Sequence, residues 1–210
     1  MDLLKQLQRI RYKLNLDRKS VVLRYIKKNK PLKILEIGVF NGEFAIRMLK
    51  AAKKVSPKSQ IIYYGVDLFE DITEEDLVSE VSPLPLKKHL VEEVLSNLNC
   101  EINLLQGKSD AVLQSMIGKI RFDLIIIDGG HSELTVANDW FWSQKLLNET
   151  GAVFFDDYTN KKGEMNGYGI KRVVDQISKN KYVISRCWNI DYFKKDYGVL
   201  STRMVKVQIK

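Results

Sequence analysis

Cysteine is scarce in this chain, and the long apolar runs of membrane proteins are missing. Only two cysteines, Cys100 and Cys187, occur among 210 residues, and no Cys-x-x-Cys spacing is present. A disulfide framework is therefore not expected, and both are predicted to be reduced, structural thiols. No apolar run approaches the length of a bilayer span, and the N-terminus has no signal-peptide pattern. We expect a cytoplasmic protein that does not enter a membrane.

Two nucleotide-binding motifs are also missing. The chain has neither the GxGxxG fingerprint of dinucleotide-binding proteins nor the GxxxxGK[ST] sequence of a P-loop. A nucleotide-like ligand, if there is one, must be held by another kind of loop.

The chain carries both positive and negative charge, but the two are unevenly distributed along the sequence. The net charge is +8. Residues 1–33 hold 11 Lys/Arg against 2 Asp/Glu, residues 34–160 hold 11 against 20, and residues 161–210 hold 12 against 4. The basic flanks are either solvated faces or surfaces that meet phosphate or an acidic partner. Nucleic acid is disfavoured as a partner because the motifs discussed below lie in the acidic middle.

Strand and helix patterns alternate through most of the chain. Residues 3–29 read as two helices with a break at 15–17, where Asp17 is a candidate N-cap. Strands are predicted at 33–37, 61–66, 101–105, 122–127 and 152–155, and helices at 42–52, 85–97, 110–116, 132–147 and 170–178. Two strand-like runs at 182–188 and 199–209 follow without a helix between them, as in an antiparallel hairpin. The pattern predicts one α/β domain, a Rossmann-like doubly wound sheet, with a helical extension (1–30), a cofactor-binding core (31–180) and an edge hairpin (181–210).

The end of the first strand is the first candidate for ligand binding. Glu36, Gly38 and Gly42 follow a short apolar run, and a glycine here lets the backbone approach a ligand closely. The next strand ends at Asp67, whose carboxylate can accept hydrogen bonds from both hydroxyls of a ribose. Together these signals indicate a nucleoside-containing ligand at the carboxyl ends of the strands.

Two later segments have alternative interpretations. Ser109 and Asp110 either cap the next helix or bond the edge of an adenine. Residues 69–84 are acidic and follow the second strand, so they form either a lid or substrate-selecting wall, or a solvated connection.

Three carboxylates are predicted to meet at the same edge of the sheet. Asp128 ends one very apolar strand, and Asp156 and Asp157 end the next. Such a group suits a hard divalent cation, although Asp128 could serve only the cofactor pocket while the other two cap a loop. His131 follows Asp128 by three residues and is either structural or a base that accepts a proton from a substrate hydroxyl.

These four strand ends together resemble class I S-adenosylmethionine-dependent methyltransferases, and most closely their small, cation-dependent O-methyltransferases of the catechol and macrocin types. The resemblance covers residues 30–180. It implies that Asp128, Asp156 and Asp157 hold a divalent cation, Mg²⁺ by preference, and that His131 and Asp128 are catalytic, with His131 where catechol-type enzymes have a lysine. It also implies a set of cofactor-binding residues: Glu36, Gly38, Phe40, Asn41, Gly42, Asp67, Leu68, Ser109, Asp110 and Asp128.

The implied reaction is methyl transfer from S-adenosylmethionine to a hydroxyl of a small molecule such as a sugar or a natural product. Alternatives are an RNA or protein acceptor, or a non-catalytic cofactor-binding protein of a polysaccharide or antibiotic pathway. The Asp/Asn-Pro-Pro-Tyr motif of many amino-group methyltransferases is absent, which argues against nitrogen acceptors in bases. A homodimer is a further expectation.

Overall fold

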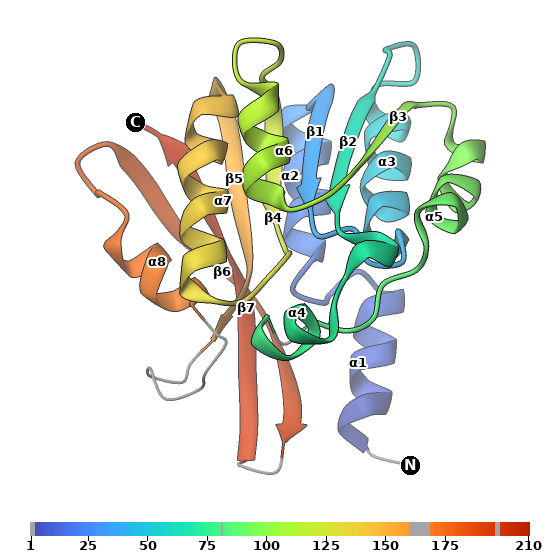
Figure 1. The fold of residues 1–210 in the computed structure, drawn as a ribbon. Coiled ribbons are helices and arrows are strands. Elements are labelled where there is room, and N and C mark those ends of the chain that lie inside the picture. Colours follow the sequence, from blue (N-terminus) through green and yellow to red (C-terminus); the bar gives the residue numbers. More distant parts are fainter. Residues whose placement is uncertain (1–2, 81, 160–168, 196–197) are drawn as a thin grey trace.

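The computed structural model describes residues 3–80, 82–159, 169–195 and 198–210, and its helices and strands alternate as predicted (Figure 1). The strands are β1 (Lys33–Ile37), β2 (Ile62–Asp67), β3 (Glu101–Gln106), β4 (Phe122–Ile127), β5 (Leu147–Thr159), β6 (Tyr182–Lys195) and β7 (Gly198–Ile209). The α-helices are α1 (Leu3–Lys13), α2 (Ser20–Asn29), α3 (Glu43–Val55), α4 (Glu74–Ser79), α5 (Lys88–Leu95), α6 (Ser109–Met116), α7 (Glu133–Leu146) and α8 (Ile170–Gln176). Short 3₁₀ turns η1 (Phe69–Asp71) and η2 (Ser96–Leu98) complete the set.

All seven strands belong to one sheet in the order β3-β2-β1-β4-β5-β7-β6. The first five pair in parallel, and β7 lies antiparallel to both β5 and β6. The predicted mostly parallel, Rossmann-like sheet with a C-terminal antiparallel hairpin is confirmed. The strand β5 is longer than predicted because it begins directly after α7, at Leu147.

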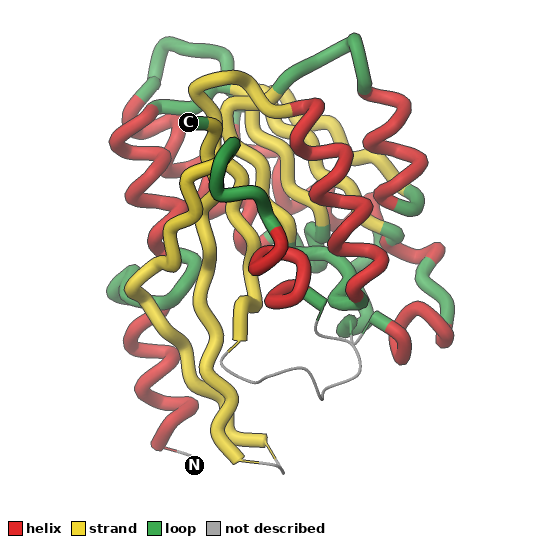
Figure 2. Tube along the Cα trace, turned by 90° about the vertical axis from the view of Figure 1, so that its left-hand side faces the viewer, coloured by secondary structure: helices red, strands yellow, loops and turns green. Residues whose placement is uncertain are grey.

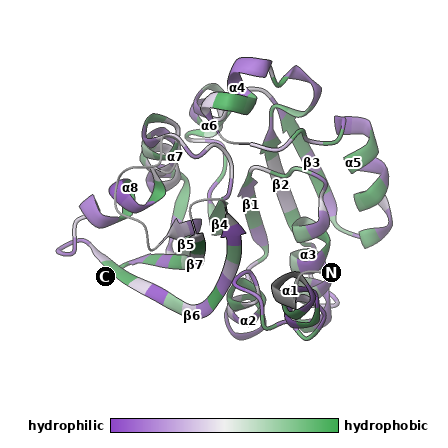
Figure 3. Cartoon of the chain, turned by 90° about the horizontal axis from the view of Figure 1, so that it is seen from below, coloured by the Kyte–Doolittle hydropathy of each residue, from purple (hydrophilic) through white to green (hydrophobic). Residues whose placement is uncertain are grey.

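Helices cover both faces of the sheet, as alternate side chains of the strands show. In β4, Leu124 and Ile126 pack with α2, α3 and α5, whereas Ile125 and Ile127 pack with α6, α7 and α8. Figure 3, which views the molecule from below, shows these two groups of helices on opposite sides of the strands. Burial on both faces explains why the second part of β4, Leu124–Ile127, is apolar at every position instead of alternating with polar residues.

The N-terminal helices have a direct bearing on the ligand edge. Because α2 leads into β1 after a short turn, it runs opposite to the strand, and its first residues lie at the carboxyl edge of the sheet (Figure 1). The predicted N-cap, Asp17, is not the cap; Lys19 holds that position without a side-chain capping bond. Instead, the Asp17 carboxylate accepts hydrogen bonds from Arg47 of α3 and from Ser20.

The C-terminal hairpin of β6 and β7 extends past the ends of the parallel strands and contacts α1. Figures 1 and 2 both show the lower halves of β6 and β7 next to this helix, and the Gln8 amide of α1 donates to the backbone oxygen of Tyr192. The insertion at 69–84 contains η1 and α4, and the predicted helix 85–97 begins only at Lys88. Most of the glycine-rich loop after Thr159 lies outside the described residues.

Within the described part of the chain, each helix is too short or too polar to cross a membrane.

Candidate active site

A cavity of about 1250 Å³ opens at the carboxyl ends of the parallel strands. Its walls come from the loops after β1, β2, β3 and β4, from α1 with the following turn, and from the segment around α4. All predicted site residues line it except Gly42 and Asp156. Those that do are Glu36, Gly38, Phe40, Asn41, Asp67, Leu68, Ser109, Asp110, Asp128, His131 and Asp157.

Gly38 joins the ends of three strands. Its φ of +89° is unfavourable for other residues, and a Cβ there would lie only 2.2 Å from the backbone oxygen of Asp128. Its N–H also donates to the backbone oxygen of Val66 at 2.8 Å. The glycine is therefore required by the close approach of β1 to β4, which forms the floor of the cavity.

Asp67 holds the loop after β1 in place. One oxygen of its carboxylate accepts the N–H groups of Val39 (2.7 Å) and Phe40 (2.8 Å), and the other accepts that of Phe69 (3.1 Å). Each carboxylate oxygen has two lone pairs. Asp67 can thus order two loops and still accept a bond from a ligand hydroxyl.

Glu36 lies at the bottom of the cavity and is almost fully buried. The hydroxyl of Tyr63 on β2 donates to its carboxylate. Burial raises the pKa of Glu36 to about 8, even though the Tyr63 hydrogen bond and the charge of Lys19 oppose the rise. The carboxyl therefore holds its proton through much of the neutral range.

Ser109 and Asp110 do not act as caps, because the N-cap of α6 is Lys108. The Ser109 hydroxyl donates to the carboxylate of Asp139 on α7 at 2.6 Å. Ser109 thus links α6 to α7, and it also borders the cavity next to Asp110.

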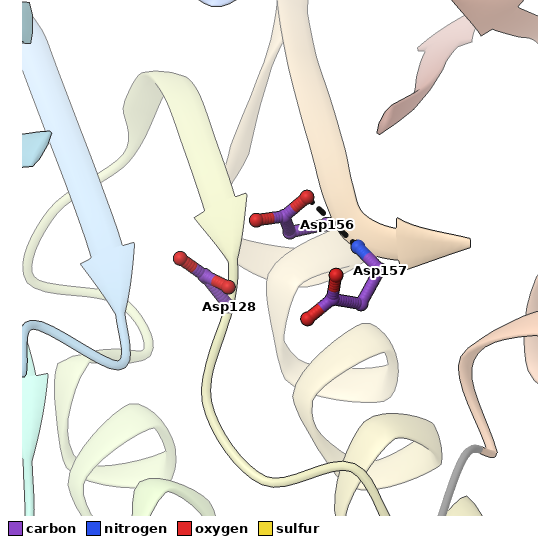
Figure 4. Close-up of side chains that lie close together, drawn as sticks. All are labelled: Asp128, Asp156 and Asp157. Carbon is purple, nitrogen blue, oxygen red and sulfur yellow. Dashed lines mark hydrogen bonds between the residues drawn. The ribbon is translucent and has the colours of Figure 1, made fainter. Parts of the chain in front are cut away.

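The three carboxylates expected to meet do so (Figure 4). Asp128, Asp156 and Asp157 each offer an oxygen atom, and these atoms lie within 4.8 Å of one another. The parallel register of β4 and β5 pairs Ile127 with Phe155, so Asp128 and Asp156, the next residue on each chain segment, lie side by side on one face. Asp157 joins them because a bulge in β5 and its own φ of 51° interrupt the alternation.

Two basic residues that the sequence analysis missed form ion pairs with these carboxylates. Arg18 donates two hydrogen bonds to Asp156, from Nε to Oδ1 at 2.6 Å and from Nη2 to Oδ2 at 2.9 Å. Its Nη2 also lies 3.1 Å from Oδ1 of Asp157. The ammonium of Lys19 bonds Asp128 and lies 3.5 Å from Asp156. The carboxylates are therefore already paired with two cations of the chain itself.

A signal for these residues was available in the order of elements. A helix that directly precedes the first parallel strand must run opposite to it, so its N-terminus lies at the ligand edge. Arg18 and Lys19 are the two residues before α2.

His131 is held from both sides. Its Nδ1 lies 2.8 Å from the backbone oxygen of Glu80 and its Nε2 lies 3.1 Å from Asp157. Burial lowers the pKa of His131, but the hydrogen bond and charge of Asp157 outweigh this and raise it to about 9. In this state both ring nitrogens serve as donors.

The segment around α4 is tied to the site as a wall. The Glu80 carboxylate accepts hydrogen bonds from the N–H and hydroxyl of Ser132 and from the hydroxyl of Thr135, at 2.6–2.8 Å. These bonds fix the end of the insertion to the start of α7, next to His131.

Comparisons with known proteins agree with this geometry. A family described as a methyltransferase domain matches residues 35–158. No curated protein matches the sequence.

Several solved structures share the fold. An O-methyltransferase from Bacillus cereus, solved with S-adenosylhomocysteine, has 15% identity and a TM-score of 0.64, covering 99% of this chain and 90% of its own. TomG of Streptomyces achromogenes, an O-methyltransferase of tomaymycin synthesis solved with S-adenosylmethionine, has 12% identity and a TM-score of 0.64, covering 91% and 79%. A Podospora anserina methyltransferase with S-adenosylhomocysteine has 14% identity and a TM-score of 0.57, covering 91% and 77%.

At these identities the solved structures show a shared fold, whereas the family match extends over more than half of the chain. We conclude that the chain belongs to this family of methyltransferase domains, within the class I S-adenosylmethionine-dependent superfamily that its motifs resemble.

Proposed function

We propose that this methyltransferase transfers a methyl group from S-adenosylmethionine to a hydroxyl group of a small molecule. The observation that carries the proposal is that one cavity is lined by the loops of Gly38 and Asp67 together with Asp128 and His131. Ligand pockets usually measure about 300–1,000 Å³. A cavity of about 1250 Å³ is large enough for a cofactor and an acceptor side by side.

The cofactor half of the cavity lies over β1, β2 and β3. S-adenosylmethionine supplies a methyl group already activated on a sulfonium. The Gly38 loop would hold its methionine part, Asp67 its ribose hydroxyls, and the Ser109–Asp110 loop its adenine. Two features support this: Oδ1 of Asp67, which borders the cavity, accepts one hydrogen bond and can accept a second from a ribose hydroxyl, and solved structures of the same fold carry this cofactor or its product.

The acceptor half lies between α1 and the segment around α4, which line the cavity from two sides. This placement favours a small acceptor over RNA or a protein. The hydrogen bond from Nδ1 to the Glu80 backbone oxygen fixes the tautomer in which, once deprotonated, Nε2 carries the lone pair. His131 would then accept the acceptor's proton at Nε2, the nitrogen that now faces Asp157.

The arrangement around the three carboxylates fits the expected divalent cation less well than the cavity fits the cofactor. Carboxylate oxygens are the correct donors for Mg²⁺. Arg18 and Lys19, however, already occupy the oxygens that an ion would need. We therefore propose that the side chains of the protein assist the transfer from S-adenosylmethionine without a bound metal ion.

The first test is cofactor binding, followed by transfer. Isothermal titration calorimetry should show binding of S-adenosylmethionine, and methyl-labelled cofactor should label members of a panel of catechols, phenols and sugars. His131→Asn should retain cofactor binding and lose transfer, whereas the exposed His89, changed in the same way, should have no effect on either. Absence of cofactor binding by the unmodified chain would refute the proposal. A cytoplasmic location and a homodimer stay predictions.

A further inference from the structure

The three clustered carboxylates place several negative charges close together in a buried region of this protein. Asp156 is only 1% exposed at its side chain, and Asp128 and Asp157 are 14% and 18% exposed. Buried like charges this close repel one another unless a cation neutralises them. The structure therefore has to provide positive charge at this point.

Arg18 and Lys19 provide it with the geometry of a built-in ion. The guanidinium of Arg18 makes a two-point contact with Asp156, the arrangement that gives the strongest pairing with a carboxylate. The ammonium of Lys19 bridges Asp128 and Asp156, which come from neighbouring strands. A divalent ion shared by the same oxygens would have to displace both side chains.

Displacement is opposed by the way the preceding turn is fixed. Arg47 of α3 holds both oxygens of Asp17 at 2.8–2.9 Å. From the other side, the Asn189 amide of β6 donates to the backbone oxygens of Leu16 and Asp17 at 2.9 and 3.0 Å. These contacts anchor the backbone that carries Arg18 and Lys19 to two different elements.

Arg18 is further held by Asp191 of β6, which accepts its backbone N–H at 3.1 Å and lies 3.4 Å from its Nη1. The Lys19 ammonium lies 4.8 Å from the ring centre of Phe44, a cation–π contact. Both side chains also border the cavity. They are thus fixed components of the cavity wall, not exposed residues that happen to reach the acids.

We infer that Arg18 and Lys19 stand permanently in the place of a divalent cation, so that this site works without a bound metal and Lys19 positions the acceptor oxygen. The inference about catalysis rests on the proposed function, whereas the inference about metal binding does not. An ammonium has three N–H donors, and the one not directed at the carboxylates can bond the acceptor oxygen. During transfer this oxygen forms a bond to the methyl carbon, the carbon–sulfur bond breaks to leave a neutral thioether, and the acceptor's proton passes to Nε2 of the neutral form of His131.

The test measures metal binding directly. Mn²⁺ is titrated into the full chain and followed by electron paramagnetic resonance, with Mg²⁺ calorimetry as a second readout. We expect no binding at 1:1 stoichiometry up to about 1 mM metal, a weak limit that corresponds to about −4 kcal/mol. A Mn²⁺ site with submillimolar affinity in the unmodified chain would overturn the inference.

Variants then test whether the two side chains stand where the ion would. The double variant Arg18→Met/Lys19→Met should gain Mn²⁺ binding by at least tenfold, and adding Asp128→Asn should abolish the gain. Lys27→Met, on the exposed face of α2, is the matched control and should gain none. A double variant that is folded by circular dichroism and binds no Mn²⁺ would also overturn the inference; if it does not fold, the result for the unmodified chain decides.

Activity gives an arm that separates this inference from the proposed function. If the chain binds S-adenosylmethionine and methylates an acceptor, excess EDTA should leave the turnover unchanged and Lys19→Met should raise KM for the acceptor. A chain that binds neither cofactor nor Mn²⁺ refutes the proposed function and leaves the metal-free assignment supported. Turnover that EDTA abolishes and Mg²⁺ restores refutes the metal-free assignment and leaves the proposed function intact.

Discussion

Asp139 on α7 allows a direct test of how burial changes the pKa of a carboxyl group next to the cavity. It is completely buried, accepts one hydrogen bond from Ser109, and its Oδ2 has no partner among the described residues. Burial raises the pKa of Asp139 to about 7, and the negative charges of Glu80 and Asp110 add to the rise against the Ser109 hydrogen bond. The substitution Asp139→Asn keeps the acceptor for Ser109 and removes the titrating proton.

The sign follows from comparing the folded and unfolded chains. Between pH 4 and 7 the folded protein retains a proton on Asp139 that the unfolded chain has lost, so this residue makes the free energy of unfolding fall as the pH rises. One pKa unit corresponds to about 1.4 kcal/mol, and a rise from 3.8 to about 7 therefore sets an upper limit of about 4 kcal/mol. Relaxation around the charge recovers part of this, and we expect about 2 to 4 kcal/mol.

The assay is urea unfolding followed by circular dichroism at pH 4, 5.5, 7 and 8.5, comparing the variant with the unmodified chain. The stability difference should shift in favour of Asp139→Asn by about 2 to 4 kcal/mol between pH 4 and 8.5. Any constant penalty for the unpartnered amide cancels in this comparison. Glu149→Gln, at an exposed position, should show no such shift. A difference that does not change with pH would show that Asp139 is ionised in the folded state and that the reasoning is wrong.

Two further predictions concern glycines of the site. Gly38→Ala places a Cβ 2.2 Å from the backbone oxygen of Asp128, and it should weaken S-adenosylmethionine binding at least tenfold by calorimetry; Gly118→Ala has a similar positive φ but meets nothing within 4 Å, and it should leave binding unchanged. Gly130→Ala places a Cβ 2.5 Å from the Glu80 carboxylate and 2.9 Å from Cγ2 of Thr135, so it should displace the Glu80 side chain from Ser132 and Thr135 and release the wall around α4. Hydrogen exchange of residues 74–79 should then accelerate, and unchanged protection would contradict the role given to Glu80.

The sheet and the meeting of its acids could be predicted because both depend on local patterns. Apolar runs such as 122–127 mark buried parallel strands, and residues at their carboxyl ends must share one edge. Asp128, Asp156 and Asp157 were brought together by this argument alone. Their partners could not be found in the same way, because Arg18 is 138 residues from Asp156 and no periodicity links them.

The position of Glu80 illustrates the same limit. The acidic stretch at 69–84 contributes residues to the cavity lining, but its composition could not say that one of its acids would bond Ser132 and Thr135 instead of facing water. Such pairings depend on where loops end in space. They are decided by the tertiary structure, after the strand order has fixed which loops are neighbours.

The contacts of Arg18 with β6 have a consequence for the folding of the chain during its synthesis. Arg18 and Asp191 are separated by 173 positions, so this pair can form only after the ribosome has synthesised β6. Until then Arg18 and Lys19 can pair with Asp156 and Asp128, but the backbone N–H of Arg18 lacks the Asp191 carboxylate that accepts it in the complete fold. Long-range closure of this kind is slow relative to local folding. A chain that ends before β6 would therefore lack the contacts of Asn189 and Asp191 that hold the turn carrying Arg18 and Lys19.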